Sequence, residues 1–267
     1  MLLQTLLRIL GVTLITLSLT FSALQAAETK TLPSTSKTSQ APAIAPQAEQ
    51  ILRQMSDYLA KQNQFQVNVQ KSVEVVLDSG QKLQFDNTVN VTVRRPNGIH
   101  AIRKGLAFDQ EVFYDGKQLT LYRTKQNYYA TIDAPPTIDQ MLDYAIDKLG
   151  IAMPAADLLY SNPYQVLMEN VKTGTYVGET LLNGVKCQQL AFRGKDVDWQ
   201  IWIEDGDRPV PRKFVLTSTK IKGEPQFIGV FSDWDFTPQL SETEFTFVPP
   251  KEAVKISFLG VTGSAKQ

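Results

Sequence analysis

Two adjoining stretches of alternating polarity, 65–77 and 83–94, constrain the fold of this chain more than any other feature. Their odd-numbered positions are mostly apolar and their even-numbered positions mostly polar, so each predicts a strand with one dry and one wet face. Asp78, Ser79 and Gly80 between them suit a short hairpin turn, which predicts an antiparallel pair. Such strands span about 40 Å. Because twist accumulates along them, the sheet is expected to coil.

The N-terminus has the pattern of an export signal. Residues 1–26 combine one positive charge, Arg8, with an apolar run and small residues near position 26, so we predict a signal peptide cleaved after Ala26. Leu24 departs from the usual cleavage pattern, and an uncleaved membrane anchor is the alternative. Residues 27–46 are rich in Thr, Ser, Pro, Ala and Gln, which predicts a disordered tether.

Composition limits the class of protein. The chain has 27 basic and 27 acidic side chains, so the mature part is almost neutral, which argues against a nucleic-acid partner. With Cys187 as its only cysteine it cannot form an intramolecular disulfide, and burial of a core must stabilise it. We predict one domain, 47–260, followed by a short tail, 261–267.

The remaining patterns predict a mainly β protein with a helical insertion. An amphipathic helix is expected at 51–59, before the long strands, and short connections then predict an antiparallel meander. Thr137 and Gln140 form a capping-box pattern that opens a helix at 137–149, with helical segments at 154–160 and 164–169. About ten to twelve strands are expected, and those beyond the first pair fall at 99–103, 106–114, 118–123, 128–132, 175–182, 185–193, 199–204, 213–220, 226–236 and 244–247. The apolar stripe of the helix at 137–149 is expected to cover the dry face of the sheet.

The residue types needed for common catalytic sites are scarce. His100 is the only histidine, which excludes a His-based triad or a His-rich metal site, and we interpret it as a surface or half-buried polar residue. Cys187 has no histidine near it in sequence and is interpreted as a small buried hydrophobe. We therefore predict no enzyme activity, no cofactor and no metal.

Two groups of carboxylates are candidate sites. Asp139, Asp143 and Asp147 recur every four residues and are interpreted as the solvated face of a helix, because a straight row does not surround a cation. A carboxylate-based hydrolase is the least favoured hypothesis. It would use a second group, which gathers at predicted turns: Asp196, Asp198, Glu204, Asp205 and Asp207.

A strongly curved sheet filled only by helices commonly leaves a cavity for an apolar ligand. Lys71 is the one charge on the dry face of the first strand and is expected near the rim of that wall or extending out of it. A fully buried, unpaired Lys71 would mean that the faces are wrongly assigned. The predicted lining residues are Phe65, Val67, Val69, Phe85, Val89, Val91, Phe113, Tyr122, Met141, Leu142, Leu149, Phe192, Trp202, Phe214 and Phe231.

Two local motifs resemble a known superfamily. The passage 197–204 with Trp199 and Trp202, followed by the Pro-rich basic stretch 208–213, is similar to a passage in LolA-like lipoprotein carriers, as is the strand turn at 113–122. More closely, 48–258 resembles the uncharacterised periplasmic family of unknown function 2092. The resemblance implies a LolA/LolB-like incomplete antiparallel β-barrel whose concave face, covered by helices, accommodates acyl chains.

The leading hypothesis is a periplasmic protein that binds a lipid, acyl chain or other hydrophobic molecule and performs no chemistry. A carrier is one form that this hypothesis takes. The alternative is a periplasmic sensor or protein-interaction module without a transport role. Expected partners are a hydrophobic small molecule, a lipid or a lipoprotein, with transient contact to a membrane or membrane protein also compatible. The sequence leaves the oligomeric state open.

Overall fold

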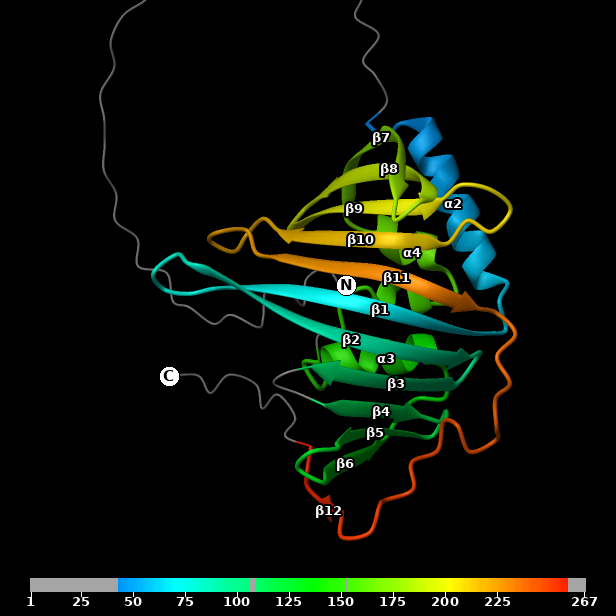
Figure 1. Ribbon diagram of the computed structural model, residues 1–267, viewed down its shortest axis with the longest axis vertical. Coiled ribbons are helices and arrows are strands. Elements are labelled where there is room, and N and C mark those ends of the chain that lie inside the picture. The colour runs from blue at the N-terminus through cyan, green and yellow to red at the C-terminus, as the bar shows by residue number, and fades with distance from the viewer. Residues whose placement is uncertain (1–42, 106–108, 152, 259–267) are drawn as a thin grey trace, which may run out of the picture.

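A computed structural model describes residues 43–105, 109–151 and 153–258. Within these ranges, the long strands β1 (Gln64–Val76) and β2 (Lys82–Arg94) form the predicted antiparallel hairpin in the middle of the sheet (Figure 1). The other elements are α2 (Pro46–Ala60), β3 (Gly98–Gly105), β4 (Gln110–Tyr114), β5 (Gln118–Arg123), β6 (Tyr128–Asp133), α3 (Ile138–Asp147), η2 (Ala156–Leu159), α4 (Pro163–Met168), β7 (Val171–Leu182), β8 (Val185–Gly194), β9 (Val197–Glu204), β10 (Pro211–Ser218), β11 (Gln226–Asp235) and β12 (Val254–Lys255).

All described strands belong to one open sheet of 12 strands, in the order β12-β6-β5-β4-β3-β2-β1-β11-β10-β9-β8-β7. Every pairing is antiparallel except that of the short β12 with β6. The sheet consists of two meanders, β1–β6 and β7–β11, joined where β11 pairs with β1. The expectation of a mainly β protein built on an unclosed antiparallel sheet is confirmed.

The alternation of the first two strands assigns the faces correctly. Phe65, Val67 and Val69 of β1 are buried on the concave face, and Val69 lies opposite Val89 of β2. The hairpin is longer than its neighbours, because β3 pairs with β2 only as far as Asn87. Its far end therefore projects beyond the rest of the sheet, as Figure 1 shows on the left.

The helices lie on one side of the sheet, behind it in Figure 1. Helix α3 begins where predicted, because the Thr137 side chain caps it by accepting a hydrogen bond from the backbone N–H of Gln140. Helix α2 packs against α4, β7 and β9, whereas α3 contacts η2. Because η2 also contacts α4, the helices form one connected layer over the sheet. No helix in the described part of the chain is long and apolar enough to cross a membrane.

The folded domain begins slightly earlier than predicted. Ala45 donates a backbone hydrogen bond of 2.9 Å to Gly174 of β7, and Gly174 donates one of 3.0 Å to Ala43. Helix α2 then starts at Pro46. Residues 43–46, which we assigned to the tether, therefore belong to the domain. The predicted signal peptide, the rest of the tether and the tail lie outside the described residues.

A C-terminal segment, 236–253, runs from the end of β11 along the outer, convex face toward β12 (Figure 1). The predicted strand at 244–247 is wrong, since these residues form a turn followed by irregular structure. Their alternation arises because Phe245 is buried against Gly98, while Phe247 packs within 5.3 Å of the Phe113 ring.

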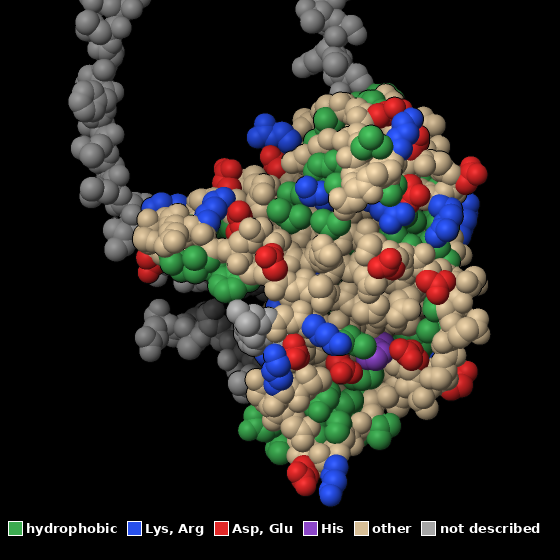
Figure 2. Space-filling view, in the orientation of Figure 1, with side chains coloured by type: hydrophobic (Ala, Val, Ile, Leu, Met, Phe, Trp, Pro, Cys, Tyr) green, Lys and Arg blue, Asp and Glu red, His purple; other side chains and the backbone are tan. Residues whose placement is uncertain are grey.

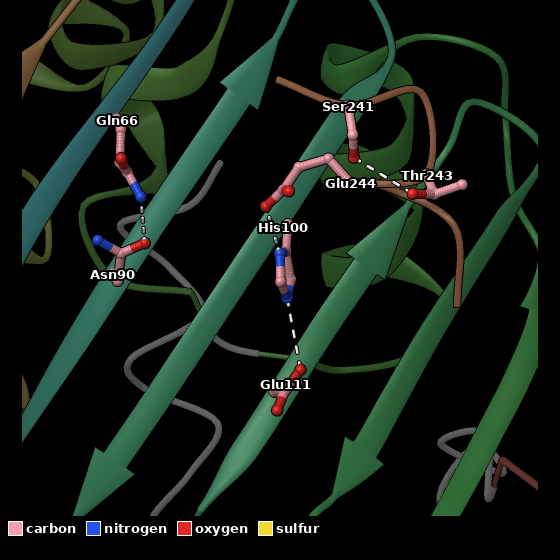
Figure 3. Close-up of polar contacts among 7 residues, drawn as sticks. All are labelled: Gln66, Asn90, His100, Glu111, Ser241, Thr243 and Glu244. Carbon is pink, nitrogen blue, oxygen red and sulfur yellow. Dashed lines mark hydrogen bonds and ion pairs between the residues drawn. The ribbon is translucent and has the colours of Figure 1, made fainter. Parts of the chain in front are cut away.

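Polar contacts also join this segment to the sheet. Figure 3 shows His100 of β3 between two carboxylates, with Nδ1 2.9 Å from Glu244 and Nε2 3.4 Å from Glu111. The ring of His100 also stacks on Phe113. Its side chain is 13% exposed, which confirms a half-buried polar histidine, and it links the C-terminal segment to β3 and β4.

Candidate functional site

A cavity of about 230 Å³ lies between the concave face of the sheet and the segment from α3 to η2. This volume is slightly below the range of roughly 300–1,000 Å³ that is typical of small-molecule sites. The lining residues are Phe65, Val67, Val69, Lys71, Val89, Val91, Ile99, Ala101, Arg103, Gln110, Val112, Leu119, Leu121, Met141, Leu142, Ala145, Ile151, Met153, Pro154, Ala155, Ala156, Leu158, Leu159, Phe227, Phe231 and Trp234.

Strand periodicity and helix periodicity together explain this lining. Every second residue of β1 to β5 faces the helices, and the register places Val91 between Val67 and Ala101 in one cross-strand row. Helix α3 contributes Met141, Leu142 and Ala145 from a single stripe. The result is a wall and a roof that are both apolar, which suits a hydrocarbon and excludes a strongly hydrated solute.

Polar side chains gather at one end of the cavity. Lys71 on β1, Arg103 on β3 and Gln110 on β4 are the described lining residues with amide or charged side chains. The ammonium group of Lys71 lies 5.5 Å from the centre of the Phe227 ring. Burial, followed by the neighbouring charge of Arg103, lowers the pKa of Lys71 to about 8. Lys71 is half-buried rather than fully buried, as expected of a side chain near the rim.

The indole of Trp234 is fixed by its own hydrogen bond. Its Nε1 donates to the backbone carbonyl of Pro211 at 3.1 Å, so its ring can face the cavity without leaving a polar group unsatisfied. The periodicity of β11 did not reveal this residue, because Asp233 has a φ of 54° and the pairing with β1 shifts nearby. A bulge of this kind changes which face the following residues occupy.

Eight of the predicted ligand-site residues line this cavity: Phe65, Val67, Val69, Val89, Val91, Met141, Leu142 and Phe231. Phe85 does not, because it lies on the projecting end of the hairpin and is 49% exposed. Leu149 follows the end of α3 and packs beside the core instead.

Phe113 and Tyr122 occupy the convex face, where both pack on Phe247 with ring centroids 5.3 Å apart. The C-terminal segment that covers them makes this part of the sheet apolar on both faces. Alternation alone therefore did not identify their inward face.

Phe192, Trp202 and Phe214 belong to the other half of the sheet. Phe192 stacks on Trp199 at 4.1 Å, and Phe214 meets the same indole at 5.6 Å, so these rings fill the space under β8–β10. Trp202 points to the convex face, where the ammonium group of Lys213 lies 4.7 Å above its ring. Phe192 and Phe214 are therefore packed core rather than cavity lining.

Three of the five carboxylates suggested for hydrolysis form ion pairs with basic neighbours. Glu204 pairs with Arg212 at 2.6 Å on the outer face. Asp198 pairs with Arg193, and Asp205 with Lys186. Within the described ranges, none of the three lines the cavity.

The helical aspartates have structural contacts. Asp139 accepts hydrogen bonds from the backbone and hydroxyl of Ser161, and Asp143 accepts one from the Tyr160 hydroxyl. They attach the segment after η2 to α3. In the part of the chain that the structure describes, no three His, Cys, Asp or Glu side chains are grouped so that they could hold a metal ion.

Cys187 is fully buried, which confirms its interpretation as a small hydrophobe. Burial raises the pKa of its thiol to about 11, so it carries little thiolate at neutral pH.

The sequence model of a family described as "Predicted periplasmic protein (DUF2092)" matches residues 48–259. The chain belongs to this family. The match covers the sheet, the helices and the C-terminal segment. No curated protein matches the chain.

Solved structures with a similar path of the chain share little sequence with it. An uncharacterised conserved protein from Thermus thermophilus is 13% identical, with 79% of this chain and 99% of that chain covered and a TM-score of 0.47. The lipoprotein LppX of Mycobacterium tuberculosis is 11% identical, with 73% and 99% covered and a TM-score of 0.46. The LolA superfamily protein NE2245 of Nitrosomonas europaea is 14% identical, with 75% and 97% covered and a TM-score of 0.37.

Proposed function

We propose that this protein binds a lipid, an acyl chain or a similar hydrophobic molecule in the cavity beneath α3 and η2, and releases it unchanged. The observation that carries the proposal is the apolar lining of a cavity that packing has left unfilled. Protein interiors normally close such spaces, because voids forfeit contacts. A protein that retains one of this size gains most from it when a ligand completes the packing.

The charge distribution favours binding over chemistry. Among the described residues, the cavity lining contains no carboxylate, and Asp198, Glu204 and Asp205 form ion pairs away from it. His100 is on the convex face, separated from the cavity by the sheet. The described side chains at the cavity can position a ligand, but they do not provide an acid–base pair.

A filled-cavity variant tests the proposal. Ala101→Trp places an indole in the cavity, whereas Ala191→Trp places the same side chain on the outer face of β8. We expect the first to abolish binding of a fluorescent long-chain lipid and the second to retain it, with both proteins folded by circular dichroism. Overpacking costs about 1–3 kcal/mol, which a domain of this size can tolerate. Equal binding by both variants would place the ligand elsewhere.

Mass spectrometry of the protein purified from its native compartment identifies the ligand directly. We expect a co-purifying hydrophobic molecule that is lost in the Ala101→Trp variant. A stoichiometric protein partner with no such molecule would instead support a sensor or interaction module.

Location and membrane contact belong to the same proposal. The family is described as periplasmic, and we infer that the chain reaches that compartment through cleavage of its first 26 residues, which N-terminal sequencing of the exported protein would test. Figure 2 shows charges of both signs scattered over the outer face, with hydrophobic side chains at the projecting end of the hairpin. Leu77 and Phe85 are exposed in that hairpin. They are the residues we expect to touch a bilayer transiently, and Phe85→Ser should weaken co-sedimentation with lipid vesicles.

A further inference from the structure

The polar end of the cavity indicates the chemical class of the ligand. Lys71, on the third cavity-facing position after Phe65 in β1, lies opposite Asn87 of β2. Arg103 lies opposite Val89 in β3, which pairs with the other edge of β2. The side chains of Lys71 and Arg103 therefore face the same cavity from the two strands that flank β2. Gln110 pairs directly with Arg103 and adds an amide to this end.

The charges at this end have one sign. Among the described residues, the cavity lining contains no carboxylate. The carboxylates on adjacent strands are engaged elsewhere: Glu74 pairs with Lys82, Asp86 accepts a hydrogen bond from Ser72, and Asp109 pairs with Lys125. Lys71 therefore has no ion-pair partner in the described part of the chain, and its described contact is the Phe227 ring.

Placing the ammonium group of Lys71 beside an apolar cavity is unfavourable unless an opposite charge joins it. The charge of Arg103, which itself lies close to that of Arg123 on β5, adds to this cost. Burial of Lys71 and repulsion by Arg103 lower the pKa of Lys71. A shift of this kind is typical of a functional site in which the bound partner would supply the opposite charge. An anion at this position would relieve both effects.

We propose that the ligand is an amphiphile with an anionic headgroup, whose hydrocarbon chain occupies the cavity and whose carboxylate or phosphate is bound by Lys71 and Arg103. This inference rests on the proposed function and narrows it to one class of ligand. The planar guanidinium of Arg103 suits two parallel hydrogen bonds to a carboxylate or phosphate, and Lys71 adds a point charge. Gln110 is placed to donate to a remaining oxygen.

Three ligands with the same chain test the headgroup: hexadecanoic acid, hexadecyl phosphate and hexadecanol, each displacing the neutral dye Nile red from the exported protein. We expect the acid or the phosphate to bind at least about tenfold more tightly than the alcohol, because only a charged headgroup can form charge-assisted hydrogen bonds with Lys71 and Arg103. The tighter of the two identifies the headgroup.

Lys71→Met should reduce this preference to less than about threefold by weakening the binding of the acid and the phosphate. Lys104→Met is the matched control, since Lys104 is exposed next to Arg103 and pairs with Thr88 on the outer face. Arg103→Met provides an independent second variant, and thermal unfolding verifies that each variant is folded.

The outcomes separate the two proposals. If the wild-type protein binds acid, phosphate and alcohol with equal affinity, or if Lys71→Met behaves like Lys104→Met, the headgroup inference is overturned and the hydrophobic cavity stands. If none of the three ligands displaces the dye or binds by calorimetry, the proposed function itself fails.

Discussion

Replacing Lys71 by methionine should stabilise the protein in a way that depends on pH. The pKa of Lys71 falls from 10.5 to about 8 in the folded protein, and one pKa unit corresponds to about 1.36 kcal/mol. The full shift therefore corresponds to about 3 kcal/mol, and because the side chain is only half-buried we expect an effect between about 1 and 3 kcal/mol.

The sign follows from proton binding. Between pH 8 and 10.5 the unfolded chain holds a proton on Lys71 that the folded protein has largely lost, so the free energy of unfolding rises with pH in this window. Below pH 8 Lys71 is charged in both the folded and the unfolded state. The folded wild-type protein is then destabilised by the full cost of burying that charge beside Arg103. Lys71→Met removes the cost, so it should be more stable than the wild type at pH 7, and the difference should shrink toward pH 10.5.

Urea unfolding of the purified protein at pH 7, 8, 9, 10 and 10.5, followed by circular dichroism, measures this difference. Lys104→Met controls for the loss of a positive charge, because its side chain is exposed. Other groups that titrate in this range, such as tyrosines, contribute equally to wild type and variant. A constant difference between wild type and Lys71→Met across the series would refute the reasoning about the cavity end.

Three further predictions concern other parts of the fold. Burial raises the pKa of Asp157 to about 6, so the free energy of unfolding should fall as pH rises from 4 to 6. Asp157→Asn should remove that fall and be about 1–3 kcal/mol more stable at pH 7 in urea titrations. Gly194→Ala would place a Cβ 2.4 Å from the carbonyl oxygen of Val197, so we expect a loss of at least about 2 kcal/mol and a lower thermal midpoint. His100→Leu removes the contact to Glu244 and should accelerate proteolysis of 236–253 without changing lipid binding; unchanged cleavage would show that the other contacts of this segment are sufficient to hold it.

Local signals in the sequence predicted much of the fold. The alternation around Val67 and Val91, the turn at 78–80 and the Thr137 cap each depend on neighbouring residues, and each was confirmed. These features are governed by backbone geometry and short-range hydrogen bonds, which sequence displays directly.

Long-range packing could not be predicted in the same way. Phe113 and Tyr122 were predicted to face the cavity, because nothing in the sequence of their strands reveals that Phe247 covers them on the convex face. Trp202 alternates correctly with Trp199, but only the packing decides which of the two indoles is buried. Trp234 reaches the cavity through a bulge, which pattern counting does not detect.

The pairing of β1 with β11 has a consequence for how the protein becomes competent to bind. These strands are neighbours in space, but Val69 pairs with Phe231 across more than half of the chain. Loop closure over such a distance is slow compared with formation of the β1–β6 meander. Because Phe227, Phe231 and Trp234 complete the cavity wall, we expect the cavity to form only after β11 has been synthesised and has paired with β1. A chain truncated before β11 would then have a sheet with an unpaired central edge, exposed to association with other chains.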